Sequence, residues 1–407
     1  MPRPAPACRK IGGMRISQRA RAIAPFYAME FGKQAAELEA AGHHVVKLSL
    51  GEPDFGAPPA VLEAMRDAMD GRPMAYTAAL GLPALRQAIA RFYADRHGVE
   101  VDPARVAVTA GASAALVLAT AALVDPGDEV LIADPSYPCN RQIVESFGAR
   151  VTLVPTTPAS RFQLDAASVR SYWSDRTRGV MIATPSNPTG TSVPADELRA
   201  LCALARERGA WRLVDEIYLD LSDPDDLGRP PGSALAHDPD AVVINSFSKY
   251  FGMTGWRLGW CVVPEALVPA LERLAQNYFL CASAPAQHAA LACFTPESLA
   301  VAEARRVEFA ERRALVLDGL DRIGLPVPVP PDGAFYAYFD VSATGLTSWE
   351  FCARALREAH VALTPGRDFG VGTAETHVRL SYAASAGELR EGLARLGKFV
   401  STLEPTA

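Results

Sequence analysis

The sequence has few cysteines and no cysteine pair at a metal-binding or redox spacing. Its seven cysteines stand far apart, at positions 8, 139, 202, 261, 281, 293 and 352. An odd number without a Cys-x-x-Cys motif argues against a disulfide framework and a zinc site, and favours reduced thiols in a cytoplasm. The adjacent pair His43–His44 falls in a glycine-containing turn, which favours a solvated turn over a metal ligand.

The sequence also lacks an excess of one charge and a clear membrane-spanning segment. Its formal net charge is −6 with both signs interspersed, so no basic face for nucleic acid is indicated. Residues 106–124 are uncharged and long enough to cross a bilayer, but glycine and hydroxyl side chains interrupt them. A strand, a glycine turn and a buried helix explain this run better. We therefore expect a cytoplasmic protein that binds neither nucleic acid nor a membrane.

Residues 1–13 are rich in proline, alanine and basic residues and contain no apolar core of a secretory signal. We interpret them as a disordered tail, or as sequence upstream of a natural start at Met14. The chain has 407 residues, 49% of them hydrophobic. That length and composition are sufficient for two domains with large cores.

From residue 105 onward the sequence repeats the order strand, turn, helix. Short runs rich in valine and isoleucine predict strands at residues 105–109, 129–133, 150–154, 179–184, 211–215, 241–245 and 258–263. They are mostly apolar throughout, which is typical of parallel strands covered by helices on both faces. The connection before the last run is too short for a helical crossover, so that strand should be antiparallel.

The last third of the chain has an α+β pattern. We expect helices at residues 296–319, 348–360 and 388–403, and strands at 334–341 and 378–382. The prediction is an α/β fold with a three-layer large domain, residues 51–285, built on a mostly parallel seven-stranded sheet, and a smaller α+β domain, residues 286–407. Residues 14–50 should pack with the smaller domain and include a strand at 45–50 and a helix from about Ala28.

In open α/β sheets the ligand sits beyond the carboxyl ends of the strands, and the unusual residues of this chain fall there. Residues 110–115 form a glycine- and alanine-rich turn that opens a helix, whose free N–H groups can hold an anion. Tyr137, between two prolines, can stack on a flat ring; a rigid turn with a core tyrosine is the alternative. Asn187 precedes Pro188, a candidate cis bond, and can donate to an oxygen; a plain turn is the alternative.

The next two strands end in a carboxylate and an amine. Asp215 ends a buried strand, where an unpaired charge is costly and a pyridinium N–H is a natural partner; helix capping is the alternative. Lys249 follows Ser246 and Ser248, with Arg257 eight positions later. The amine can form a Schiff base with an aldehyde, and the hydroxyls and guanidinium can hold a phosphate. Those two groups on one molecule describe pyridoxal phosphate; an ordinary lysine in a surface loop is the alternative.

Taken in order, these motifs resemble a known family. Asn187-Pro-Thr-Gly, Asp215-x-x-Tyr218 and Ser246-x-Ser-Lys249 with Arg257 are similar to the fold-type I pyridoxal-phosphate enzymes, and more narrowly to the class I/II aminotransferases related to aspartate aminotransferase. The resemblance runs from about residue 48 to 383 and includes Ser49-Leu-Gly-Glu-Pro-Asp-Phe, the loop from Tyr76 to Arg86, and His377-Val-Arg-Leu-Ser-Tyr-Ala.

The resemblance implies a role for each matched residue. Lys249 is the Schiff-base lysine and moves the α-proton, Asp215 pairs with the pyridine nitrogen, and Tyr137 stacks on the ring. Asn187 and Tyr218 bond the 3-hydroxyl oxygen. The phosphate is expected to contact Ala112, Ser113, Ser246, Ser248 and Arg257, and also Tyr76 from the partner subunit of a homodimer. Substrate is expected to contact Gly51, Asn187 and Arg379, whose guanidinium takes the α-carboxylate as a bidentate pair.

Two departures from the family pattern bear on the substrate. No second arginine is apparent for a distal carboxylate, which argues against aspartate and glutamate. Arg367 and Asp368 stand where relatives often carry small residues; we expect a solvated salt bridge between them, with substrate contact by Arg367 as the alternative. The apolar segment around Phe26 belongs to a region that covers the site in relatives, and Phe335 and Tyr336 should lie near its entrance.

The sequence therefore predicts a two-step aminotransferase that moves an amino group from a neutral L-amino acid to pyruvate, 2-oxoglutarate or another 2-oxo acid. A lyase or decarboxylase on the same scaffold is the alternative, since the cofactor stabilises several carbanions. Aspartate aminotransferase proper ranks lower. A non-catalytic regulatory protein is disfavoured because the region before residue 48 is short and lacks a helix-turn-helix pattern.

Overall fold

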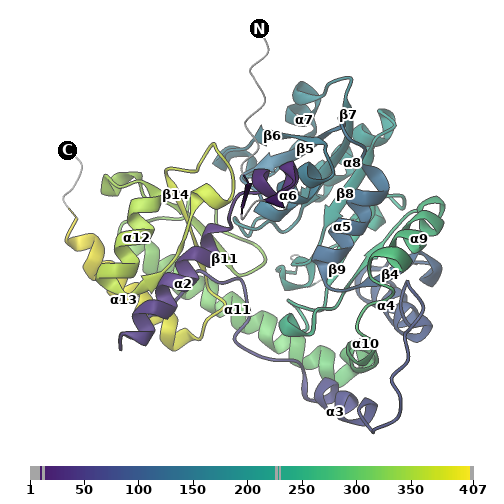
Figure 1. The fold of residues 1–407 in the computed structure, drawn as a ribbon. Helices are drawn as coiled ribbons and strands as arrows, with labels where there is room; N and C mark the ends of the chain where they lie inside the picture. Colours follow the sequence, from purple (N-terminus) through teal and green to yellow (C-terminus); the bar gives the residue numbers. More distant parts are fainter. Residues whose placement is uncertain (1–9, 12–13, 225–227, 229–230, 404–407) are drawn as a thin grey trace.

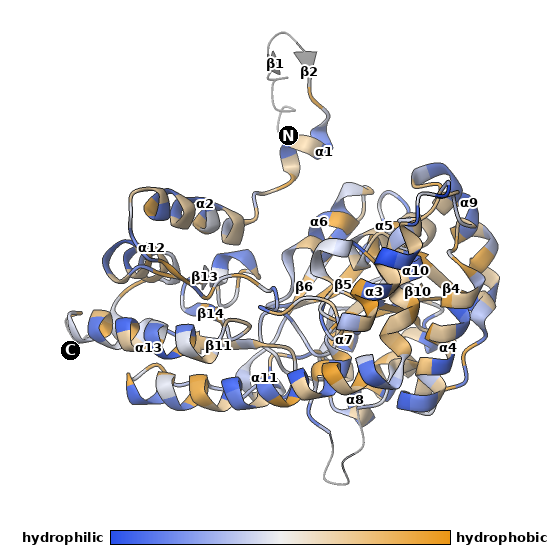
Figure 2. Cartoon of the chain, turned by 90° about the horizontal axis from the view of Figure 1, so that it is seen from below, coloured by the Kyte–Doolittle hydropathy of each residue, from blue (hydrophilic) through white to orange (hydrophobic). Residues whose placement is uncertain are grey.

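The computed structural model describes residues 10–11, 14–224, 228 and 231–403. A larger sheet-containing part lies beside a smaller one, and the long helix α11 (Pro296–Arg322) runs along both (Figures 1 and 2). Of the predicted tail, residues 1–9 and 12–13 lie outside the described residues. Strand β1 (Lys10–Ile11) pairs antiparallel with β2 (Met14–Arg15).

The larger part is built on a seven-stranded sheet in the order β4–β10–β9–β8–β7–β5–β6. The strands are β4 (Val106–Thr109), β5 (Glu129–Asp134), β6 (Arg150–Pro155), β7 (Thr177–Ala183), β8 (Trp211–Asp215), β9 (Val242–Ser246) and β10 (Gly259–Val262). Strand β10 is antiparallel to β9 and β4, and the other neighbouring pairs are parallel. The predicted strands and the antiparallel seventh strand are confirmed.

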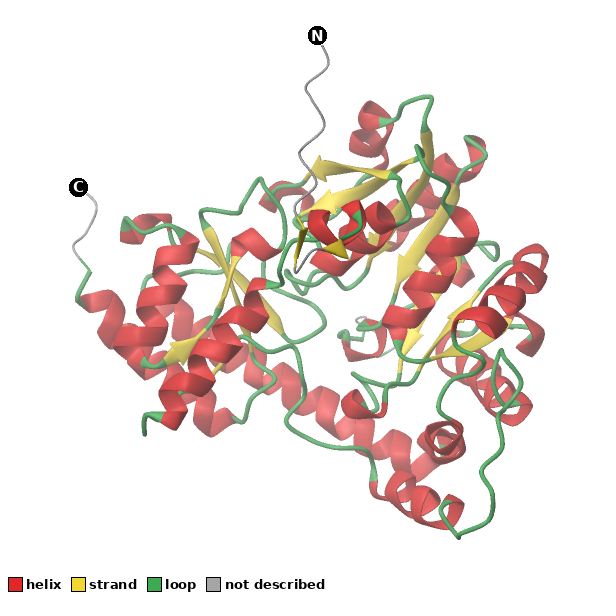
Figure 3. Cartoon of the chain, viewed as in Figure 1, coloured by secondary structure: helices red, strands yellow, loops and turns green. Residues whose placement is uncertain are grey.

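The apolar strands form the middle layer of three, with helices on both faces (Figure 3). Successive side chains of a strand point to opposite faces. Thus Val242 and Ile244 of β9 belong to one core with helices α5 (Ala112–Leu123) and α9 (Val268–Tyr278), whereas Val243 belongs to the core that contains α8 (Ala195–Glu207). In Figure 2 the central strands are mostly orange, while α11 alternates between orange and blue. Burial on both faces explains why these strands read as continuous apolar runs.

The uncharged run at residues 106–124 divides as predicted into a strand, a glycine turn and a buried helix. It comprises β4, Gly111 and α5. Across the described part of the chain, no helix combines the length and the apolar character needed to span a membrane.

The smaller part contains a three-stranded sheet in the order β11 (Tyr336–Asp340), β14 (His377–Ser381) and β13 (Thr364–Pro365), with antiparallel pairing. Strand β3 (Val46–Lys47), shorter than the predicted strand at 45–50, pairs parallel with β12 (Val361–Ala362). Helix α2 (Tyr27–Ala40) packs here too, through Tyr27 and Phe31 against Trp349 of α12 (Ser348–Ala359). The N-terminal segment thus contacts C-terminal elements, while the exact domain boundaries stay a prediction.

The remaining helices complete the two parts. They are α1 (Gln18–Ala22), α3 (Pro59–Ala68), α4 (Pro83–His97), α6 (Pro138–Ser146), α7 (Ala166–Tyr172), α10 (Ala284–Ala290) and α13 (Ala386–Ser401). Short 3-10 helices span Pro103–Arg105, Pro158–Ser160, Leu219–Leu221, Ala234–Ala236, Thr254–Trp256, Glu265–Leu267, Leu291–Phe294, Ser342–Thr344 and Gly366–Asp368.

Candidate active site

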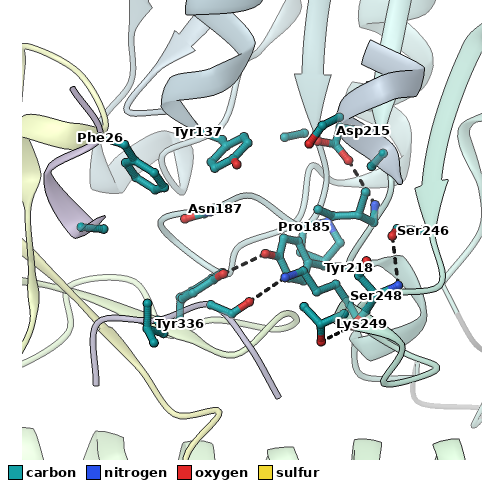
Figure 4. A pocket seen from close by; sticks show the side chains of 18 of the residues that line it. Phe26, Tyr137, Pro185, Asn187, Asp215, Tyr218, Ser246, Ser248, Lys249 and Tyr336 are labelled. Atoms are coloured by element: carbon teal, nitrogen blue, oxygen red, sulfur yellow. Dashed lines mark hydrogen bonds between the residues drawn. The ribbon is translucent and has the colours of Figure 1, made fainter. Parts of the chain in front are cut away.

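A pocket lies where the carboxyl ends of β7, β8 and β9 meet the start of α5, the N-terminal segment and the smaller part (Figure 4). The predicted site residues that line it are Gly51, Ala112, Ser113, Tyr137, Asn187, Asp215, Tyr218, Ser246, Ser248, Lys249, Arg257 and Arg379. Tyr76 does not line it and is 80% exposed. Residues far apart in the sequence meet here because parallel strands present their carboxyl ends at one edge of the sheet.

One end of the pocket is built to bind an anion. Helix α5 begins after Gly111 without any side-chain cap, so no capping oxygen occupies its first N–H groups, and its first two residues, Ala112 and Ser113, line the pocket. Gly111 has φ +80°, and a Cβ on it would lie 2.7 Å from Nη2 of Arg257. The glycine therefore lets the guanidinium approach the helix N-terminus, where both favour negative charge.

Two serines after β9 extend this anion-binding end. Ser246 Oγ accepts a hydrogen bond from the Ser248 N–H at 3.0 Å and lies 3.3 Å from the carbonyl of Leu258. Arg257 Nη1 donates to the Thr254 carbonyl at 2.9 Å, which orients the guanidinium. The turn between β9 and β10 thus brings hydroxyls and a positive charge to the start of α5.

Lys249 lines the pocket, close to Gly51, Tyr218 and Phe335. Its Nζ donates to the Gly51 carbonyl at 2.6 Å and lies 5.8 Å from the ring centroids of Tyr218 and Phe335. Enclosure away from water lowers the pKa of Lys249 to about 8, against the opposing charge of Glu52. A lysine in this condition provides far more neutral amine near pH 7 than an exposed lysine does.

Asp215 ends β8, and its buried carboxylate accepts few hydrogen bonds. Its Oδ1 accepts from the Ile217 N–H at 3.2 Å, and within the described residues no other hydrogen bond to it is found. Burial raises the pKa of Asp215 to about 6, although the Ile217 N–H and Lys249 act in the opposite direction. The predicted alternative, a helix cap, does not apply, because the short helix that follows begins after Tyr218. The remaining oxygen is suited to a cationic N–H.

Arg379 of β14 reaches the pocket from the smaller part. Its Nη1 donates to Asn187 Oδ1 at 2.7 Å, and its Nη2 donates to the Ser49 carbonyl at 2.6 Å and to Thr364 Oγ1 at 3.3 Å. The predicted cis bond between Asn187 and Pro188 is present. Arg379 is 2% exposed, and its Nε has no hydrogen-bond partner among the described residues. The guanidinium of Arg379, which lines the pocket, therefore retains one unused donor.

Tyr336 was predicted only to lie near the entrance, but it forms part of the pocket wall. Its hydroxyl lies 2.8 Å from that of Tyr218, and its ring centroid is 4.5 Å from the Arg379 guanidinium. A Cβ on Gly51 would lie 2.0 Å from the Tyr336 hydroxyl oxygen, so only glycine fits at position 51. The sequence signal was an aromatic strand after a proline-rich connection, which does not specify where each ring points.

The predicted salt bridge between Arg367 and Asp368 is wrong. Arg367 instead pairs with Glu375 through two contacts of 2.8 Å at the surface. Asp368 is buried and accepts hydrogen bonds from the backbone N–H groups of Tyr27 and Ala28, each at 2.7 Å. The N-terminus of α2 satisfies the Asp368 carboxylate, which leaves the arginine to the other acid in the loop.

Comparison with known proteins agrees with this geometry. Residues 43–396 match the family model "Aminotransferase class I and II". A valine–pyruvate aminotransferase of Mycobacterium tuberculosis is 41% identical over 95% of this chain and 98% of its own length. The aspartate/prephenate aminotransferase of Thermus thermophilus is 35% identical over 94% of this chain and 98% of its own length.

Solved structures show the same relationship. A crystal structure of an aminotransferase from Mycobacterium tuberculosis has a TM-score of 0.91 and 40% identity, covering 96% of this chain and 100% of that one. Aspartate aminotransferase from Thermus thermophilus with maleate has a TM-score of 0.89 and 35% identity, covering 95% and 100%. The chain therefore belongs to the class I and II aminotransferases, fold-type I enzymes that require pyridoxal phosphate.

Proposed function

We propose that this aminotransferase takes its amino group from a neutral aliphatic L-amino acid, such as valine or alanine, and passes it to pyruvate or a related 2-oxo acid. The observation that carries the proposal is the distribution of charge in the pocket. Among the described lining residues, the cations are Lys249, Arg257 and Arg379. The wall formed by Phe26, Met29 and Leu50 is apolar and offers no partner for a distal carboxylate.

The shape and chemistry of the pocket fit pyridoxal phosphate. The uncapped start of α5 and the Arg257 guanidinium suit its phosphate, and Asp215 Oδ2, which accepts no hydrogen bond from the described residues, suits its ring N–H. The remaining roles follow the residues' positions. Tyr137 would cover a face of the ring, and Asn187 and Tyr218 would hold its 3-oxygen. Lys249 would bond to the aldehyde carbon. The phosphate would be contacted by Ala112, Ser113, Ser246, Ser248 and Arg257.

Three residues of the chain would then carry the reaction. When bound, pyridoxal phosphate supplies an electron sink that stabilises negative charge at the substrate α-carbon. The Asp215 carboxylate would pair with the ring N–H and favour its protonated form. Arg379 fixes the substrate α-carboxylate, and with it the direction of the α-hydrogen. Lys249 Nζ would take that proton from the α-carbon and return it to the cofactor carbon on the other side of the linking nitrogen, a task suited to an amine whose pKa lies near 8.

The relatives support the choice of substrate. The 41% identical relative is a valine–pyruvate aminotransferase, whereas the relatives named for aspartate that are cited above are 35% identical. Similarity of this degree fixes the family and not the substrate, so the apolar wall is the stronger argument.

We propose in addition that the enzyme is a homodimer in the cytoplasm. Tyr76 is 80% exposed and Met69 is 62% exposed, and large exposed apolar side chains of this kind support contact with a second copy, in which Tyr76 would reach the partner's cofactor phosphate. The six cysteines in the described part of the chain are free thiols, which supports a reducing compartment. Analytical ultracentrifugation of the purified enzyme tests the dimer, and cell fractionation tests the location.

A steady-state panel of donors and acceptors tests the proposed substrates. With pyruvate saturating, we expect kcat/KM for valine or alanine to exceed that for aspartate by about 100-fold, because the side-chain carboxylate of aspartate would face the apolar wall of Phe26, Met29 and Leu50. A higher kcat/KM for aspartate would overturn the assignment. Measuring released ammonia and carbon dioxide in the same reactions distinguishes transamination from lyase or decarboxylase activity.

A further inference from the structure

Helix α2 is capped by a residue from a distant part of the chain. Its own N-cap, Phe26, provides no side-chain hydrogen bond. Instead both carboxylate oxygens of Asp368 accept from the first turn, Oδ1 from the Tyr27 N–H and Oδ2 from the Ala28 N–H. Asp368 is 4% exposed, and such charge-assisted bonds to a helix N-terminus are strong and directional.

The start of α2 supplies part of the substrate pocket. Phe26, Ala28 and Met29 line it, and the Phe26 ring meets the ring of Tyr137 edge-on at 6.3 Å (Figure 4). Tyr27 points the other way and packs on Trp349 at 5.3 Å. Where α2 begins therefore decides where the Phe26 ring stands.

The loop that carries Asp368 is itself fixed to the large sheet. The Ser136 N–H donates to the Phe369 carbonyl at 2.7 Å. The Asp134 carboxylate, at the end of β5, accepts from the N–H groups of Val371 and Gly372. The loop thus transmits the position of β5, and of the adjacent Tyr137, to the first turn of α2.

We propose that Asp368 is a positioning residue of this enzyme: by holding the first turn of α2 it fixes the Phe26 wall that selects substrates with apolar side chains. The proposal rests on the proposed function for the identity of the substrate, but its structural half does not. A loosened α2 would widen the pocket beside the substrate side chain. The value of kcat/KM should fall for valine, whose branched side chain would contact that wall, and should change much less for alanine.

The charge environment of Asp368 makes the arrangement sensitive to pH. Burial raises the pKa of Asp368 to about 6, although the Tyr27 and Ala28 N–H groups and Arg379 oppose that effect. The titratable and charged groups around it are Tyr27 on α2, Cys139 and Arg141 on α6, Cys352 on α12, Arg379 on β14 and the adjacent Arg367. As pH falls through about 6 the carboxylate gains a proton and becomes a weaker acceptor, so KM for valine should rise.

Hydrogen exchange and kinetics of Asp368→Ala test the proposal together. Exchange of the Tyr27 and Ala28 amides, followed in the full-length holoenzyme, should accelerate while exchange in β5 and β8 stays unchanged. The preference for valine over alanine in kcat/KM should fall about tenfold, with the loss in KM for valine rather than in kcat. Asp368→Asn keeps one acceptor oxygen, so its amide exchange and its valine preference should lie between those of the wild type and those of Asp368→Ala. Because asparagine does not titrate, this variant should also lose the rise in KM below pH 6.

Two further variants separate positioning from general damage. Glu375→Gln removes the neighbouring surface ion pair and leaves the Asp368 contacts intact, so it should behave as the wild type. Phe26→Ala should reproduce the loss of valine preference, and Asp368→Ala should add little to it, because both act through one wall. Additive effects, or unchanged amide exchange in Asp368→Ala, would overturn the proposal. If the wild type did not use valine at all, the proposed function would fall while the exchange result still stood.

Discussion

Replacing Arg379 by lysine keeps the charge in the pocket and removes the planar pair of donors. In the structure the guanidinium donates to Asn187 Oδ1, to the Ser49 carbonyl and to Thr364 Oγ1. A lysine on β14 presents one ammonium group with three donors and cannot meet a carboxylate side-on while holding these partners. The substitution therefore tests whether Arg379 recognises the substrate through a bidentate contact.

The expected loss follows from one charge-assisted hydrogen bond. Such a bond is worth about 1.5–3 kcal/mol, which corresponds to about a 10- to 150-fold decrease in kcat/KM. Because donor and acceptor both carry an α-carboxylate, the decrease should be similar for valine and for pyruvate. The Ser49 carbonyl and Asn187 side chain lose a donor as well, so a lower Tm should accompany the kinetic effect.

Steady-state kinetics with each substrate varied in turn measure the decrease, and thermal unfolding reports the stability change. Arg367→Lys is the matched control, because Arg367 pairs with Glu375 at the surface and does not line the pocket. Its kcat/KM should stay within about twofold of the wild type, as for most surface changes. If Arg379→Lys kept kcat/KM within threefold for both substrates, the assignment of the α-carboxylate site would be refuted.

Two further predictions concern the anion-binding end and a buried acid behind the site. Gly111→Ala should weaken pyridoxal-phosphate binding, measured by dialysis and absorbance, because φ is +80° and the new Cβ would lie 2.7 Å from Arg257; unchanged affinity would contradict this. Burial raises the pKa of Glu216 to about 7, above its value of about 4.5 in an unfolded chain. Between these two pH values the carboxyl ionises in the unfolded state but stays protonated in the folded state, so the free energy of unfolding should fall as pH rises from about 4.5 to 7. Glu216→Gln should remove this component in urea titrations, and parallel pH profiles for variant and wild type would be the opposite result.

The core of the site was predictable because its residues follow strands that could be recognised. Lys249, Asp215 and Asn187 come after apolar runs, and parallel strands must bring their carboxyl ends to one edge. The ordered spacing of those residues then pointed to one cofactor. Strand β10 was predictable as antiparallel for a separate reason, because its connection to β9 is too short for a crossover.

The predictions that the structure corrected concern tertiary contacts between segments far apart in the sequence. Asp368 stands next to Arg367, and adjacency suggested a salt bridge; the N-terminus of α2, some 340 positions away, binds the carboxylate instead. Tyr336 becomes a wall of the pocket only because Gly51 leaves room for its hydroxyl. Neither relationship has a local sequence signal, since each is decided by how α2 and β11 dock onto other elements.

The half-reaction with the amino donor alone shows whether this enzyme is a transaminase that depends on Lys249. Purified enzyme loaded with pyridoxal phosphate is mixed with L-valine, and the cofactor spectrum and the products are followed before pyruvate is added. We expect the cofactor to be converted to pyridoxamine phosphate with release of an equimolar amount of the 2-oxo acid. Alanine should then form when pyruvate is added, and neither step should occur in Lys249→Ala. Release of ammonia or carbon dioxide in place of the 2-oxo acid, or wild-type rates in Lys249→Ala, would contradict it.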